Sequence, residues 1–283
     1  MNKPHDILII VLFLLLWVLV FVFIVTVPYP FDQKELGNID IKQKYIVDYL
    51  EDVVHPRTII IGDTHGCVEE LNELLEKVHF KQNRDRLIFI GDLIGKGPFS
   101  KDVLDVAINS SSTCIRGNHD HILINWYNSP EEKKPEMKPS YLKIAKSLSA
   151  EHWNYLLSCP LYDTLPEYKC ILVHAGVEPD IPLEEQSAKM LMNIRNIESN
   201  GKGSKSQDLG TPWIDTWDGP ELIIFGHDAI RGIQVKENEE GELIAMGLDS
   251  GAVYGGQLSA FVLPERKLLQ MPAHKIYEQP KLK

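Results

Sequence analysis

Five short apolar runs in this chain end in the same way, on a carboxylate, imidazole or amide beside a glycine. Each run is rich in β-branched or large apolar residues and stops at glycine, which is the pattern of a short buried strand. A fold that contains all five must place several polar side chains at strand ends. The runs are TIIIGDTHG (58–66), RLIFIGD (86–92), TCIRGNHD (113–120), CILVHAG (170–176) and ELIIFGH (221–227).

Helical segments separate the first three runs, and later runs follow one another without helices. CVEELNELLEKV (67–78) and SKDVLDVAI (100–108) are amphipathic, and a Lys-rich stretch (129–158) is also typical of helices. Alternating strands and helices predict parallel strands with right-handed crossovers. The late runs LIAMGLD (243–249) and QLSAFVLP (257–264) predict antiparallel pairing. We therefore expect an α/β fold, a four-layer α/β/β/α sandwich with one mixed and one more antiparallel sheet.

The strand ends supply a set of metal-binding side chains. The carboxyl ends of strands in open α/β sheets converge on ligand sites, so these residues are expected to meet. One Gly-Asp or Gly-His pair would carry little weight, but five in succession indicate a metal site. Three imidazoles, two carboxylates and an amide, without a thiolate, suit divalent ions such as zinc, manganese, iron or cobalt. The expected cofactor is zinc, with manganese, cobalt or magnesium as alternatives. The predicted ligands of two divalent ions are Asp63, His65, Asp92, Asn118, His174 and His227.

The blocks GDTHG, GDLIGKGP, RGNHD, VHAG and FGH resemble the signature blocks of the calcineurin-like metallophosphoesterase superfamily. The longer segments GDTHGCVEELNELLEKV and GLDSGAVYGGQLSAFVLP resemble those of its ApaH-like branch, the symmetrical diadenosine tetraphosphatases. The resemblance covers roughly residues 57–265. With its apolar N-terminus, the chain is also similar to the fungal vacuolar zinc-dependent endopolyphosphatases.

The resemblance implies a role for each site residue. Asp63, His65 and Asp92 would hold one metal ion, and Asp92 would bridge to a second ion held by Asn118, His174 and His227. His119, paired with Asp120, would be the general acid. Lys96, where the family usually has arginine, would bind substrate phosphate, although a solvated surface role for Lys96 or Arg195 is an alternative. The candidate phosphate-binding residues are Lys96, Arg116 and Arg195.

The predicted activity is hydrolysis of phosphoanhydride bonds inside inorganic polyphosphate chains, as the resemblance to endopolyphosphatases implies. The nearest alternative is hydrolysis of dinucleoside polyphosphates such as diadenosine tetraphosphate, or of an mRNA cap. A protein Ser/Thr phosphatase is a weaker alternative because Gly95 stands where that group typically has an acid. A catalytically silent membrane scaffold is another weaker alternative, and the presence of every predicted ligand argues against it.

The N-terminus predicts a membrane anchor. Residues 7–27 hold no charge and are long enough to span a bilayer, and no small-residue cleavage site follows them. We expect a short tail (1–6), a single-pass signal-anchor (7–27), a tether (28–56), the catalytic domain (57–265) and a C-terminal tail (266–283). Charges near the span do not fix its orientation, but the resemblance implies a type II protein with its catalytic domain in the vacuolar lumen.

Composition limits the possible partners. The chain has 29 Lys and Arg against 40 Asp and Glu, a formal net charge of -11, which argues against a nucleic-acid-binding surface. The four cysteines are expected to be buried free thiols, and a disulfide is the alternative in a lumenal domain. Asn109 begins a glycosylation sequon. Trp213 and Trp217 are expected in the core, with a wall of the substrate cleft as the alternative.

Overall fold

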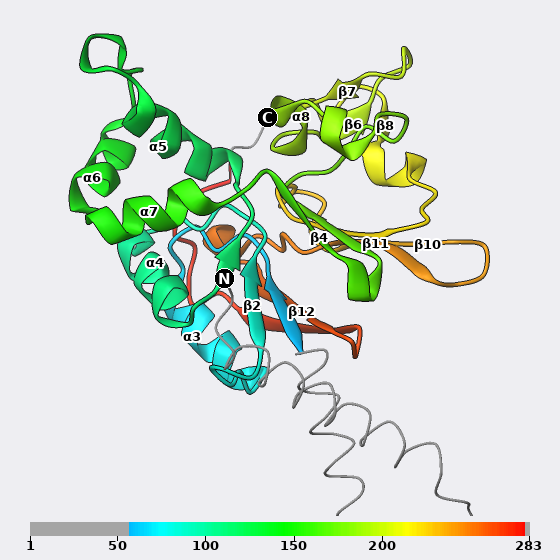
Figure 1. Ribbon diagram of the computed structural model, residues 1–283, viewed down its shortest axis with the longest axis horizontal. Coiled ribbons are helices and arrows are strands. Elements are labelled where there is room, and N and C mark those ends of the chain that lie inside the picture. The colour runs from blue at the N-terminus through cyan, green and yellow to red at the C-terminus, as the bar shows by residue number, and fades with distance from the viewer. Residues whose placement is uncertain (1–56, 281–283) are drawn as a thin grey trace, which may run out of the picture. The chain divides into compact units, whose positions relative to one another are not determined.

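The computed structural model describes residues 57–280. The predicted membrane span, tether and N-terminal tail lie outside these residues, as does the end of the predicted C-terminal tail. Within residues 57–280, no helix combines the length and apolar content needed to cross a bilayer. The described residues form two five-stranded sheets with helices and short segments on their outer faces (Figure 1).

In the first sheet, the first three predicted strands lie next to one another and reach one edge of the sheet. β1 and β2 are parallel, as are β2 and β3, whereas β12 pairs antiparallel with β1 and with β13. The order is β13 (Lys267–Pro272), β12 (Gln257–Leu263), β1 (Thr58–Ile61), β2 (Arg86–Phe89) and β3 (Thr113–Cys114).

The second sheet repeats this mixture. β5, β9 and β11 are parallel neighbours, and the antiparallel strands β4 and β10 form its edges. The prediction of a more antiparallel second sheet is therefore wrong: long connections, rather than regular helices, serve as the crossovers between its parallel strands. The order is β10 (Gln234–Glu237), β11 (Leu243–Gly247), β9 (Leu222–Phe225), β5 (Cys170–Val173) and β4 (Tyr162–Leu165).

Alternation along β1 explains how the layers stack. Ile60 faces the second sheet, in a cluster with Leu172 and Ile224, whereas Ile59 and Ile61 face the helices. Successive strand residues point to opposite faces, so one uninterrupted apolar run fills two cores. The helices on the outer face of the first sheet are α3 (Val68–Lys77) and α4 (Ser100–Asn109).

Three further helices form a cap at one end of the first sheet (Figure 1). They are α5 (Asn118–Asn128), α6 (Pro139–Ser147) and α7 (Ala150–Ser158), in the region predicted to be helical. A disulfide between Cys114 in β3 and Cys159 after α7 ties this cap to the sheet. The expectation of four free thiols is thus wrong for this pair, because two residues 45 apart in sequence meet where α7 returns to the sheet, while Cys67 and Cys170 are buried and free.

The outer layer over the second sheet contains little helix, which differs from the predicted fourth helical layer. Short elements with many turns cover this face instead: α8 (Ala188–Leu191), η4 (Leu183–Glu185), η5 (Trp213–Thr216) and a small sheet of β6 (Asn196–Ile197), β7 (Gly203–Ser204) and β8 (Thr211–Pro212). Trp213 is buried and its ring packs on Phe225, which confirms its core role, and Trp217 packs into the same cluster. The remaining short helices are η2 (Glu131–Lys133), η3 (Pro166–Tyr168) and η6 (Ala252–Tyr254).

The C-terminal segment belongs to the domain rather than forming a tail. β13 extends the first sheet beyond the predicted boundary at residue 265. The chain then packs against α3, where the His274 N–H and the Tyr277 hydroxyl donate to the carboxylate of Glu70 at 2.9 and 2.8 Å. A buried glutamate in α3 thus obtains partners that the local sequence did not reveal.

Candidate metal centre

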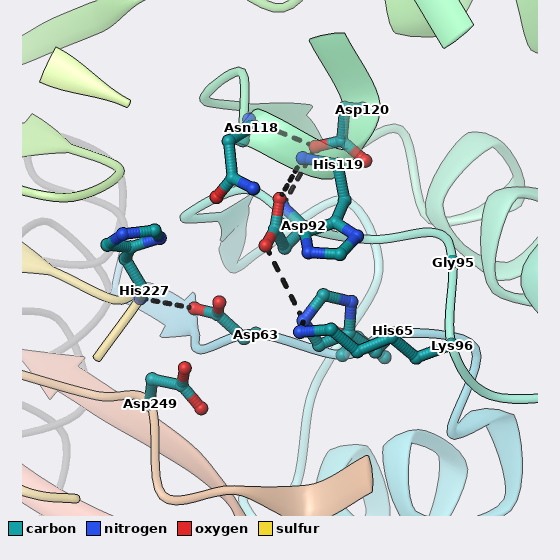
Figure 2. A network of polar contacts seen from close by, with 12 residues as sticks. Asp63, His65, Asp92, Gly95, Lys96, Asn118, His119, Asp120, His227 and Asp249 are labelled. Carbon is teal, nitrogen blue, oxygen red and sulfur yellow. Dashed lines mark hydrogen bonds and ion pairs between the residues drawn. The ribbon is translucent and has the colours of Figure 1, made fainter. Parts of the chain in front are cut away.

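Residues from both sheets meet at the carboxyl ends of their strands (Figure 2). Asp63 follows β1 and Asp92 follows β2, whereas His174 and His227 follow β5 and β9 of the other sheet. Close approach depends on glycine here: a Cβ on Gly91, whose φ is +103°, would lie 2.6 Å from His174 Nδ1. The glycines predicted to end the strands therefore let backbone segments touch.

Asp92 is the centre of the cluster. Its Oδ2 lies 3.5 Å from Nε2 of His65 and 3.5 Å from Nε2 of His174, and its Oδ1 accepts the backbone N–H of His119 at 2.8 Å. Burial alone would raise the pKa of Asp92, but His174 and His119 bring it well below its usual range. Burial would likewise lower the pKa of His174, and the nearby carboxylates raise it to about 10. The carboxylate is thus placed and ionised as a bridging ligand would be.

Backbone carbonyls orient two of the imidazoles. Nδ1 of His65 lies 3.1 Å from the carbonyl of Ile94, and Nδ1 of His174 lies 3.0 Å from that of Ile90. Because a carbonyl only accepts, Nδ1 carries the proton in each neutral ring and Nε2 offers its lone pair to a cation. Oδ1 of Asn118 lies 3.1 Å from His174 Nε2, so two predicted ligands of one ion are adjacent.

Two buried polar atoms of this centre have no hydrogen-bond partner among the described residues. These are Oδ2 of Asp63 and Nε2 of His227, although the other carboxylate oxygen of Asp63 accepts the His227 N–H at 3.0 Å. Burial and the neighbouring Asp249 raise the pKa of Asp63, and burial lowers the pKa of His227. Buried atoms of this kind are normally satisfied, and a divalent ion would satisfy both.

The ligand atoms form two overlapping groups with Asp92 in common. Atoms of His65, Asp92 and His119 lie within 4.8 Å of one another, as do atoms of Asp92, His174 and His227. Nitrogen and oxygen donors, orphaned buried atoms and a shared carboxylate fit two divalent ions. His119, predicted only as the general acid, is thus itself a member of the first group.

Lys96 and Arg195 lie in the cleft in front of this centre, which we call the site cleft. Nζ of Lys96 lies 2.7 Å from Nε2 of His65 and 5.1 Å from the centroid of the Tyr254 ring. Nε of Arg195 lies 3.6 Å from the carboxylate of Asp228. Neither is a solvated surface cation. The site cleft is lined by Asp92, Lys96, Asn118, His119, Lys138, Tyr141, Arg195, Lys205, His227 and Tyr254, among others.

The structure corrects the predicted role of Arg116. Its Nε donates to the carbonyl of Cys159 at 3.1 Å and its backbone N–H donates to that of Pro160 at 2.7 Å. The side chain does not line the site cleft. Arg116 precedes α5 and points toward the end of α7, so it joins the cap to the sheet instead of contacting the space in front of Asp92.

Asp120 is not paired with His119, contrary to the sequence prediction. Its buried carboxylate accepts the backbone N–H groups of Asp92 at 2.8 Å and Gly117 at 3.0 Å. The two residues are neighbours in α5, where successive side chains diverge by roughly 100°. Burial and the charge of Asp92 raise the pKa of Asp120 to about 7. Asp120 therefore anchors the loop that carries Asp92, and Nδ1 of His119 is hydrogen-bonded to the hydroxyl of Tyr141.

Sequence reasoning missed several residues of the site cleft or its surroundings, Tyr254 among them. Asp249 is buried beside Asp63 and follows β11 in LIAMGLD, so the strand-end rule that found the other ligands could have found it. Tyr141 lies in α6 of the cap, Lys138 directly precedes that helix, and Lys205 directly follows β7 of the small outer sheet. Nothing in their local sequence distinguishes them from ordinary surface residues.

Comparison with known proteins identifies the family. The model for calcineurin-like phosphoesterases matches residues 56–247. A symmetrical bis(5'-nucleosyl)-tetraphosphatase of Coxiella burnetii is 40% identical over 78% of this chain and 94% of its own. The asymmetrical tetraphosphatase PrpE of Anoxybacillus flavithermus is 26% identical over 79% and 97%. The crystal structure of a protein described as a diadenosine tetraphosphatase superposes with a TM-score of 0.69 at 36% identity, covering 78% of this chain and 95% of that one.

These matches confirm the resemblance to the superfamily and to its ApaH-like branch, and the closeness to fungal endopolyphosphatases stays a prediction. The superposition also supports the α/β fold with mixed sheets. The chain is a metallophosphoesterase hydrolase by family and fold, and it belongs to the calcineurin-like phosphoesterase family.

Proposed function

We propose that this protein hydrolyses phosphoanhydride bonds in linear oligophosphates at a centre of two divalent ions. The observation that carries the proposal is Asp92, whose Oδ2 lies 3.5 Å from imidazoles of both sheets. Asp63, His65 and Asp92 would hold one ion, and Asp92, Asn118, His174 and His227 the other. Zinc suits these donors best, with manganese, cobalt or magnesium as alternatives.

The bound ions would supply an activated water and would neutralise charge on the phosphoryl oxygens. The protein's own residues would orient the substrate and transfer protons. Lys96 reaches the centre as a single point charge, so it attracts a phosphate without the two-pronged hold of an arginine. Arg195 lies across the site cleft and would hold a second phosphate. His119 faces the cleft beside Asp92, in the position of a proton donor to the leaving phosphate.

Dinucleoside polyphosphates are the first candidate substrates. The relatives named above are called bis(5'-nucleosyl)-tetraphosphatases, and they align over nearly their whole length with this chain. An activity conserved with them would cut diadenosine tetraphosphate between internal phosphates. The cations of the site cleft would neutralise the tetraphosphate despite the acidic balance of the whole chain.

Inorganic polyphosphate is the second candidate, supported by the lining of the site cleft. Its two tyrosines are both engaged, Tyr141 with His119 and Tyr254 with the ammonium of Lys96. The ring of Tyr141 is buried and the ammonium of Lys96 lies over one face of Tyr254, so the site cleft offers little open aromatic surface on which a base could stack. Lys138 from the cap and Lys205 from the small outer sheet add cations from two different parts of the fold, as binding a longer polyanion would require.

The purified full chain, loaded with zinc or manganese, should cut diadenosine tetraphosphate or a polyphosphate of defined length. Chromatography would identify ADP from symmetrical cleavage, or ATP and AMP from asymmetrical cleavage. A gel would show chain shortening for polyphosphate. Lys138→Ala is expected to impair cleavage of long polyphosphate more than that of diadenosine tetraphosphate, and Lys143→Ala in α6, the helix that follows Lys138, is the control. Hydrolysis of neither substrate with any of these ions would refute the proposal.

We also propose that the protein is a type II membrane protein whose catalytic domain lies in a vacuolar lumen. Residues 7–27 support anchoring, and the Cys114–Cys159 disulfide supports an oxidising compartment. Asn109, in its sequon at the end of α4, is exposed as glycosylation requires.

Translation of the full chain with sealed microsomes is the corresponding test. We expect a glycosylated form that migrates more slowly on a gel and is protected from protease. Glycosidase treatment should restore the faster migration, and Asn109→Gln should be protected from protease but migrate as the unmodified form. A protease-sensitive, unmodified domain would show the opposite orientation.

A further inference from the structure

The cap places Tyr141 directly against the candidate proton donor. Tyr141 is the third residue of α6, it is 6% exposed, and its hydroxyl is hydrogen-bonded to Nδ1 of His119. The two rings are stacked with centroids 5.9 Å apart and planes 27° apart. A residue from a separate helix of the cap therefore contacts the imidazole nitrogen that is directed away from the centre.

The space that Tyr141 occupies exists because residue 95 is glycine. A Cβ at Gly95 would lie 2.9 Å from the Tyr141 hydroxyl and 3.3 Å from Nδ1 of His119. The φ of Gly95 is +89°, a conformation that favours glycine. The loop that follows β2 thus offers no side chain at this point to fix the imidazole, and the hydroxyl of Tyr141 lies there instead.

The remaining contacts of His119 do not set the orientation of its ring. Its backbone is fixed by the N–H bond to Asp92, and its ring meets the ring of His65 edge to face at 4.8 Å (Figure 2). Asp120, the neighbouring carboxylate, is bonded to backbone N–H groups. Among the described residues, the hydroxyl of Tyr141 is the polar group bonded to Nδ1 of His119.

We infer that Tyr141 is a positioning residue that holds the His119 imidazole with Nε2 toward the leaving group. A hydroxyl can donate to or accept from Nδ1, so it holds the ring whichever nitrogen carries a proton. The inference rests on the proposed function for the identity of the leaving group, and it assigns the cap a part in catalysis: α6 completes a site whose other members come from the sheets.

Tyr141→Phe tests this role in the metal-loaded full chain, because it keeps the ring and removes only the hydroxyl. Aryl phosphates are suitable probes since they do not depend on the natural substrate. Phenyl phosphate has a poor leaving group that needs a proton, and p-nitrophenyl phosphate has a good one. We expect kcat for phenyl phosphate to fall about tenfold or more, with kcat for p-nitrophenyl phosphate changed less than about threefold and KM little changed for both.

The matched control is Tyr127→Phe, which removes the hydroxyl of a tyrosine that is 46% exposed on α5 and stacks on Trp153. It should leave both rates unchanged. Equal losses of kcat for the two esters in Tyr141→Phe would overturn the inference, since a merely structural defect does not discriminate between leaving groups. Cleavage of both aryl esters without cleavage of either oligophosphate would sink the proposed function and leave this inference intact.

A second readout does not require turnover. The imidazole nitrogens of His119, assigned by comparison with His119→Gln, should show a hydrogen-bonded Nδ1 in the 15N NMR spectrum. Tyr141→Phe should shift that signal and leave those of His65 and His174 in place. If the wild-type protein hydrolyses neither aryl ester, this spectrum decides alone: an unchanged His119 signal in Tyr141→Phe refutes the contact.

Discussion

Asp92→Asn is expected to bring the number of bound divalent ions below two per chain and to remove hydrolysis. Asp92 is the carboxylate common to both ligand groups, so its charge would hold both ions. Removing one partner of a buried charged pair costs about 3–5 kcal/mol. At about 1.4 kcal/mol per factor of ten, this corresponds to roughly 10²–10⁴-fold weaker metal binding.

The fold should survive this substitution for two reasons. Asparagine keeps an oxygen that can accept the His119 N–H, and it tolerates the left-handed backbone of this position, where φ is 51°. Metal content by mass spectrometry of the native protein and affinity by calorimetry give readouts that do not require a substrate. Circular dichroism would confirm that the fold is retained.

Asp163→Asn is the matched control, because Asp163 is an exposed carboxylate in the edge strand β4 and does not line the site cleft. It should bind two ions as the wild type does. Two ions bound with unchanged affinity in Asp92→Asn would contradict the bridging role and with it the two-metal proposal.

The side chains that meet at the candidate metal centre could be predicted from sequence because they follow one local rule. Each stands where an apolar strand stops at a glycine, and the topology of the sheets brings those ends together, as for Asp63, Asp92 and His227. Asp249 obeys the same rule at the end of β11 and was missed because it follows a late strand assigned to an antiparallel sheet. Local sequence was therefore informative wherever the sheet itself positions the side chain.

Residues positioned by contacts between distant segments could not be predicted in this way. The role expected for Asp120 was wrong because the pairing was inferred from adjacency, whereas the direction of each side chain in α5 sends the carboxylate to the backbone of Asp92. Arg116 was misassigned because its partner, the carbonyl of Cys159, lies at the far end of the cap. The role of Tyr141 gives no local sequence signal, because it depends on the absence of a side chain at Gly95, which is distant in sequence.

The double variant Cys114→Ala/Cys159→Ala is expected to lose about 4 kcal/mol of unfolding free energy, from the greater chain entropy of an open loop of about 45 residues. For a domain of this size the midpoint of thermal unfolding should fall by roughly 8–16 °C. Scanning calorimetry of the metal-free protein, with and without a reductant, would measure it.

Cys67→Ala/Cys170→Ala is the matched control, because it also removes two buried sulfur atoms but no covalent link. Reductant should lower the midpoint of the wild type and of this control, and it should not change that of the variant that lacks Cys114 and Cys159. If reductant does not change the midpoint of the wild type, the bond is not formed.

The disulfide also affects the candidate metal centre. Arg116, which lies two residues before Asn118, donates a hydrogen bond to the carbonyl of Cys159. Loosening the end of α7 would therefore displace Asn118 at the start of α5, so the variant should also bind the second ion more weakly.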